Sequence, residues 1–186
     1  MSVSQVAAPT SGRRVAVLVA CVLALGLSLT WAYFSMRAVM GVGGACADGG
    51  PYVSAQPCPG GAFLIAFAIP LMIIAAMVGS AVAISVSAPN LLIPMWAFLF
   101  GSLGWNFLEY GFTTEGGLIW GWIICGVVFW AMAAPAVYAI VLGLRTTVSP
   151  TEGVESHPEA LKWWFIYPVL AGAGAVVGLL TFNAFG

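Results

Sequence analysis

Two cysteines, Cys46 and Cys58, have the spacing and surroundings that most clearly predict chemistry. They lie in a segment rich in glycine and proline, a composition that excludes a regular helix or a central strand. In an oxidising compartment a disulfide would tie this segment down and contribute about 3 kcal/mol to stability. We therefore predict a structural disulfide between these two residues.

A redox-active thiol pair is the alternative for the same cysteines. Such pairs usually have Cys-x-x-Cys spacing, because closely placed thiols lower the pKa of one another. Cys46 and Cys58 lie further apart, and Arg37 is the only basic residue nearby. A zinc site is also disfavoured, since two cysteines and Asp48 leave the ligand set incomplete. We expect no metal site and no cofactor.

Asn106 and Glu109 form the second candidate site, because their spacing of three residues places both on one face of a helix. An ionisable residue at membrane depth is a functional candidate, so the pair could line a transport path. Glu109 also lies near the end of its apolar segment, where it could instead contact water or Arg37. Both interpretations remain open from the sequence.

Small residues predict where helices approach one another closely. Gly117 and Gly121, and likewise Gly174 and Gly178, form Gly-x-x-x-Gly pairs. Such pairs allow close contact between helices in lipid. We expect them to pack inside the molecule rather than against another subunit.

Composition decides the class of protein. Of the 186 residues, 62% are hydrophobic and 6% are charged, whereas a soluble domain has roughly half and about 25%. A chain this apolar has too little polar surface to be a soluble globule. Five Lys and Arg residues with a net charge of −1 exclude nucleic acid as a partner, because phosphates require many cations. The expected surroundings are the lipid bilayer.

Five apolar segments are long enough to cross a bilayer, which requires about 20 helical residues. They cover residues 15–36, 62–86, 91–108, 118–144 and 163–184. The sequence thus predicts an all-α, polytopic transmembrane helix bundle, with a tail at 1–14 and a single transmembrane domain at 15–186. The third segment is the shortest, and a re-entrant segment is its alternative.

Basic residues predict the orientation, because Lys and Arg concentrate on the cytoplasmic side. Arg13, Arg14, Arg145 and Lys162 fall on one side and Arg37 on the other. We therefore expect a cell-membrane protein with its N-terminus inside and its C-terminus outside. The segment 38–61 is then an outer loop and 145–161 an inner loop. Tyr33 and Tyr110 fall near the outer interface, where aromatic residues act as anchors.

The glycine-rich segment at 43–61 reads Gly-Gly-x-Cys-Ala-x-Gly-Gly-Pro-Tyr, followed by Cys-Pro. Placed just after a first apolar helix, it resembles a loop of small, uncharacterised multi-pass membrane proteins of actinobacteria. The resemblance covers these residues and, in outline, the flanking helices. It implies an actinobacterial origin and a membrane location, and it implies no mechanism.

Residue inventory disfavours catalysis. The only histidine, His157, lies in the predicted inner loop, so neither a haem held by two histidines nor an outer Ser-His-Asp set can form. We expect a non-catalytic accessory or structural subunit of a cell-envelope complex, which binds other membrane proteins or a second copy of itself. A small transporter or channel using Asn106 and Glu109, and a thiol-redox protein, are the alternatives.

Overall fold

The computed structural model describes residues 12–46, 56–113, 117–148 and 158–185. These residues form five α-helices and one short 3-10 helix, with no strand among them, which confirms the all-α prediction. In chain order the elements are α1 (Gly12–Gly41), η1 (Ala62–Leu64), α2 (Ile65–Ser85), α3 (Leu92–Thr113), α4 (Trp120–Val148) and α5 (Pro158–Phe185).

Four of the helical segments are long and apolar enough to cross a membrane: Gly12–Gly41, Ala62–Ser85, Trp120–Arg145 and Lys162–Phe185. Helix α3 is not among them, because Asn106 and Glu109 lower its mean hydropathy. That α3 spans the membrane stays a prediction.

Four of the five helices extend beyond their predicted apolar segments at one or both ends, whereas α2 stays within its segment. Helix α1 begins at Gly12, so Arg13 and Arg14 belong to it and not to the tail. Helix α3 continues to Thr113, α4 to Val148, and α5 begins at Pro158. Backbone hydrogen bonding does not require an apolar side chain, and proline is well suited to a first helical position. Apolar length therefore underestimates the length of these four helices.

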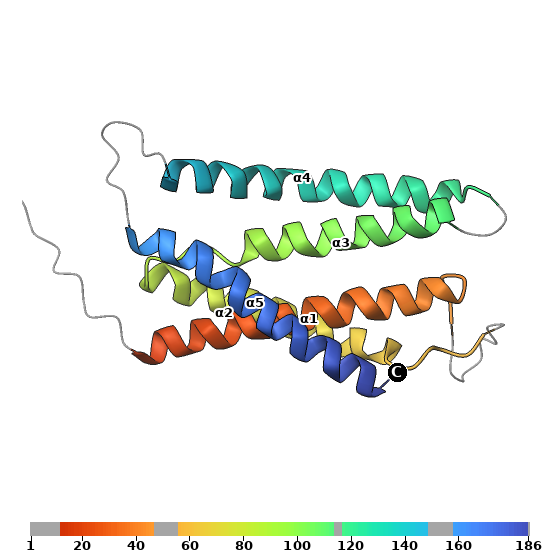
Figure 1. The fold of residues 1–186 in the computed structure, drawn as a ribbon, viewed down its shortest axis with the longest axis horizontal. Coiled ribbons are helices and arrows are strands. Elements are labelled where there is room, and N and C mark those ends of the chain that lie inside the picture. Colours follow the sequence, from red (N-terminus) through yellow and green to blue (C-terminus); the bar gives the residue numbers. More distant parts are fainter. Residues whose placement is uncertain (1–11, 47–55, 114–116, 149–157, 186) are drawn as a thin grey trace, which may run out of the picture.

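Helix α1 is the centre of the molecule, since α2 and α5 both pack along it. Helices α3 and α4 form an antiparallel hairpin that contacts α1 mainly through α3 (Figure 1). The core is built on one side of α1 by Leu18, Val22 and Leu25, against Met72 of α2 and Tyr167 of α5. The fold is thus a three-helix unit with an attached helical hairpin.

Glycines bring α1 and α5 into backbone contact. A Cβ built on Gly174 would overlap the carbonyl oxygen of Leu23, and one on Gly26 would overlap that of Ala171. A Cβ on Gly178 would come within 2.9 Å of the Leu27 carbonyl oxygen. Without these glycines the two helices could not lie at this distance, because small residues are what permits close backbone approach.

Glycines also allow close contact between α3 and α4. A Cβ on Gly104 would overlap the indole ring of Trp130, and one on Gly126 would come within 2.6 Å of the Leu108 side chain. The hairpin is further held by the Trp96 indole N–H, which donates to the Met132 carbonyl at 3.0 Å.

A short turn between α2 and α3 fixes where the hairpin starts. Asn90 Oδ1 accepts a hydrogen bond from the Leu92 amide at 2.7 Å, which caps the first turn of α3. The Ser80 hydroxyl of α2 donates to the same oxygen at 2.9 Å and accepts from the Leu91 amide at 3.1 Å. Tyr167 of α5 donates to the Pro89 carbonyl at 3.0 Å. The turn is thus anchored on both α2 and α5.

Candidate functional site

The helices run between two opposite ends of the bundle (Figure 1), and different residues lie at each end. At one end lie the start of α1, the end of α4 and the start of α5. Arg13 and Arg14 lie in the first turn of α1, Arg145 lies in the last turn of α4, and Lys162 lies near the start of α5. We call this the basic end. The opposite end carries the Cys46–Cys58 bond and is called the disulfide end.

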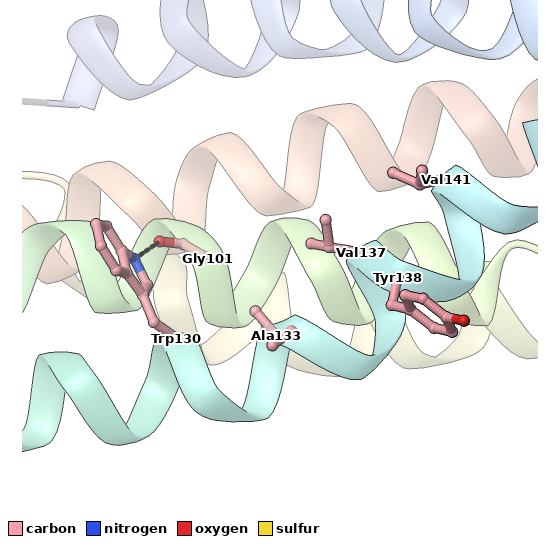
Figure 2. A pocket seen from close by; sticks show the side chains of 7 residues that line it. Gly101, Trp130, Ala133, Val137, Tyr138 and Val141 are labelled. Atoms are coloured by element: carbon pink, nitrogen blue, oxygen red, sulfur yellow. Dashed lines mark hydrogen bonds between the residues drawn. The ribbon is translucent and has the colours of Figure 1, made fainter.

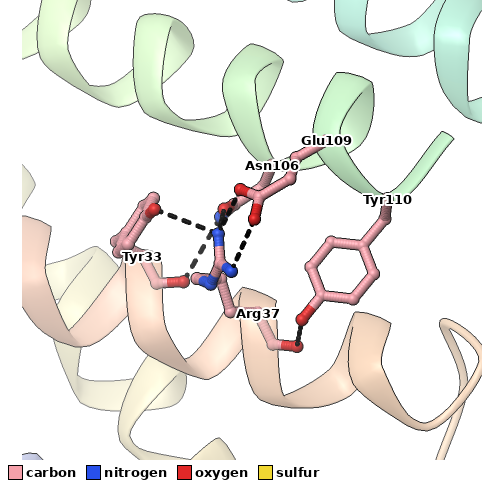
Figure 3. Close-up of polar contacts among 5 residues, drawn as sticks. All are labelled: Tyr33, Arg37, Asn106, Glu109 and Tyr110. Atoms are coloured by element: carbon pink, nitrogen blue, oxygen red, sulfur yellow. Dashed lines mark hydrogen bonds and ion pairs between the residues drawn. The ribbon is translucent and has the colours of Figure 1, made fainter. Parts of the chain in front are cut away.

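An ion pair at the disulfide end joins α1 to α3. The Arg37 guanidinium donates through Nη1 to Glu109 Oε2 at 2.5 Å and through Nη2 to Glu109 Oε1 at 2.9 Å (Figure 3). Both side chains are about two-thirds buried, at 28% and 33% exposure. Two parallel bonds between a planar guanidinium and a carboxylate are the strongest form of such a pair.

Asn106 lies fully buried beside this pair, at 0% exposure. Its Oδ1 accepts a hydrogen bond from Arg37 at 3.3 Å, and its Nδ2 donates to the Tyr33 carbonyl at 3.4 Å. Both the oxygen and the nitrogen of the Asn106 side-chain amide are therefore hydrogen-bonded to residues of α1. In this arrangement Asn106 does not face an open path.

Two tyrosines complete the cluster around Arg37. The Tyr33 hydroxyl accepts a hydrogen bond from Arg37 Nη1 at 3.2 Å, and the Tyr110 hydroxyl donates to the Arg37 carbonyl at 3.3 Å (Figure 3). The guanidinium carbon lies 5.7 Å from the Tyr33 ring centroid and 5.4 Å from that of Tyr110. Both distances suit cation–π attraction. The two aromatic rings and the Glu109 carboxylate therefore surround the Arg37 guanidinium.

The sequence placed Asn106 and Glu109 on one helix face and named Arg37 as a contact of Glu109 in the non-functional alternative. The ion pair shows that contact. The role of Tyr33 and Tyr110 was missed, because both were interpreted only as interfacial anchors. The four-residue spacing from Tyr33 to Arg37 is the signal that could have revealed the first of them.

The disulfide between Cys46 and Cys58 is confirmed, with their Cα atoms 4.9 Å apart. Gly61, which precedes η1, has a left-handed backbone with φ of +78°, and its carbonyl accepts from the Ser35 hydroxyl at 3.1 Å. A side chain at Gly61 would also collide with Phe182 of α5. The disulfide thus closes a loop that is followed by Gly61, and the contacts of Gly61 already fix this end of the loop to α1 and α5. Asp48 lies outside the described residues.

The two predicted glycine pairs behave differently. Gly174 and Gly178 lie against α1 of the same chain. Gly117 precedes α4 and has a left-handed φ of +110°, and neither it nor Gly121 has a neighbour within 4 Å of an added Cβ. The prediction that Gly117 and Gly121 share a helix face is therefore wrong, because the helix starts after Gly117. A left-handed glycine before the helix serves the turn instead.

Within the described part of the chain, no group of three His, Cys, Asp or Glu side chains is placed to hold a metal ion. His157 lies outside that part. No protein family, curated protein or solved structure matches this chain. Function must therefore be inferred from the contacts of the chain itself.

Proposed function

We propose that this chain is a non-catalytic subunit of a cell-membrane complex, which binds another membrane protein through helix α4. The chain has four helices suited to crossing a membrane. Its polar cluster and its disulfide serve to hold the molecule together. Its least buried helix supplies the surface for the partner.

The exposure of α4 is the observation that carries this proposal. Only 6% of its most apolar stretch is buried inside the chain, against 39% in α1 and in α2. The side away from α3 exposes Ile124, Val128 and Leu142, at 60%, 52% and 48%. In lipid such a helix gains stability from a neighbour through packing. A second membrane helix on this side would give α4 the packing that its own chain does not.

The contacts of Asn106 and Glu109 favour this role over transport. A residue that lines a path must exchange its protein partners for the transported species. Here Glu109 is held by two charge-assisted bonds, and the buried amide of Asn106 is engaged by both Arg37 and Tyr33. Opening such a path would break the contact that holds α3 to α1.

The distribution of basic residues supports the expected orientation. Four of the five Lys and Arg residues lie at the basic end, whereas Arg37 is neutralised by Glu109 at the disulfide end. By the positive-inside rule the basic end faces the cytoplasm. The disulfide end then faces an oxidising compartment, where its bond is stable.

Site-specific photocrosslinking in native membranes tests the proposal. A photoreactive residue at Val128 on α4 should give a discrete crosslinked product that contains a second membrane protein. The matched control is Ile74 on α2, which is equally apolar and 60% exposed but lies on a helix already packed along α1. The proposal fails if both positions give the same diffuse pattern, or if Val128 crosslinks only to a second copy of this chain.

A further inference from the structure

An apolar groove of about 570 Å³ runs along the hairpin on the α4 surface (Figure 2). It is lined by Gly101 of α3 and by Trp130, Ala133, Val137, Tyr138 and Val141 of α4. This is a different side of α4 from that of Val128, because 130, 137 and 141 lie more than a quarter turn away around a helix of 3.6 residues per turn.

Small and large residues together shape this groove. Nothing lies within 4 Å of a Cβ built on Gly101, and Ala133 and Ala134 are the small side chains on the facing stretch of α4. Trp130 donates its indole N–H to the Gly101 carbonyl at 3.2 Å, which fixes the ring as a wall (Figure 2). Tyr138 forms the other wall, with its side chain 69% exposed. The indole N–H of Trp130 is therefore already hydrogen-bonded, and the Tyr138 hydroxyl is the other polar side-chain group of the lining.

The groove leads to a cationic group. Val137, Val141 and Arg145 follow one another at intervals of four residues, so they lie on one face of α4. Arg145 lies one turn, or roughly 6 Å, beyond the last groove residue. Trp164 of α5 lies beside Gly143, with its ring 3.4 Å from an added Cβ. Gly143 lies roughly 200° around the helix from Arg145, so α5 contacts a different side of α4 from the groove.

We propose that this groove and Arg145 together bind an anionic glycerophospholipid, with one acyl chain in the groove and the phosphate at Arg145. The lining is almost wholly apolar, which suits a hydrocarbon chain, and the Tyr138 hydroxyl is a polar group at its wall. Arginine binds phosphate through paired N–H donors. Basic residues where membrane helices meet the interface recognise anionic headgroups. The inference requires α4 to lie in the membrane, and it does not depend on the partner-binding role of its other side.

The length of the groove suits an acyl chain. The stretch from Trp130 to Val141 is about 16 Å long, and one extended hydrocarbon chain can lie along it.

Native mass spectrometry of the full-length protein, released from detergent with added phosphatidylglycerol or phosphatidylcholine, tests this site. The wild-type protein should retain phosphatidylglycerol preferentially. Arg145→Gln should weaken that retention about fivefold, the effect expected of one cation at the interface. Arg13→Gln removes the same charge at the same end of the bundle but away from the groove, and it should have a smaller effect.

Filling the groove gives the second arm of the test. Gly101→Leu should reduce retention of phosphatidylglycerol. Gly121→Leu, which also enters open space on the hairpin, should not. The proposal is overturned if the wild type retains both lipids equally, if the two arginine variants lose lipid to the same extent, or if a second copy of the chain occupies the groove and excludes lipid. Arg145→Gln alters an exposed side chain at a helix end, so it decides the matter even if Gly101→Leu fails to fold.

Discussion

Arg37 and Glu109 form a two-bond ion pair although 72 positions separate them in the chain. The pair connects the end of α1 to the end of α3, at the disulfide end of the molecule. At the basic end, the α2–α3 turn is anchored by Ser80 and Tyr167. The hairpin is therefore fixed to the three-helix unit at both ends. Between these ends, α3 and α4 pack chiefly against each other.

Replacing Glu109 by Gln should loosen the hairpin. The variant leaves the Arg37 cation partly buried and without its carboxylate, and the remaining amide is a weaker acceptor. We expect a loss of about 1–2 kcal/mol of stability. Thermal unfolding in detergent micelles measures the change, with intrinsic tryptophan fluorescence as the signal.

The double variant Arg37→Gln with Glu109→Gln provides the control, because it removes both charges together. If the pair acts as described, the double variant should be less destabilised than the sum of the two single variants. Strictly additive losses would show that the two charges do not interact in solution.

Reduction of the disulfide should also destabilise the protein, by about 3 kcal/mol on the chain-entropy estimate for a loop of this size. Without reductant, an alkylating reagent added to the denatured protein should label Cys21 and Cys125, the two free cysteines. After reduction it should label four. Cys58→Ser should lower the unfolding temperature, whereas Cys125→Ser should leave it nearly unchanged, since Cys125 is exposed. Four labelled cysteines before reduction would contradict the structure.

Two glycines on α5 offer a matched test of the α1–α5 contact. An added methyl group at Gly174 meets the backbone of Leu23, whereas at Gly172 it meets nothing within 4 Å. Gly174→Ala should therefore destabilise the protein by about 1–3 kcal/mol. Gly172→Ala should be neutral or slightly stabilising, because alanine has the higher helix propensity. Equal unfolding temperatures for the two variants would mean that α1 and α5 do not touch there.

The sequence predicted the helices and the disulfide because their signals are local. Each helix follows an apolar run, and Cys46 and Cys58 are close in a segment that needs a cross-link. It did not predict which lone glycines make the close helix contacts. Gly26, Gly104 and Gly126 belong to no Gly-x-x-x-Gly pair, and only the crossing of two helices gives them their role.

The polar cluster could be predicted only in part for the same reason. The face shared by Asn106 and Glu109 is a property of one helix. Their attachment to Arg37 and Tyr33 depends on the placement of α3 beside α1, which the apolar pattern of either helix leaves undetermined. Tertiary packing, and not local periodicity, makes these residues a single cluster.

Reporter fusions should reveal the orientation and whether α3 crosses the membrane. Because the basic end carries four cations, a fusion after Val148 should be cytoplasmic. A fusion after Gly117 should lie on the opposite side, since the hairpin places the end of α3 at the disulfide end (Figure 1). A fusion at the C-terminus should share the side of Gly117, because α5 returns from the basic end. An alkaline phosphatase reporter is active only outside the cytoplasm, and a fluorescent protein folds only within it. Cytoplasmic fusions at both 117 and 148 would mean that α3 and α4 do not cross as drawn, and the ion pair would then have to form at the cytoplasmic face.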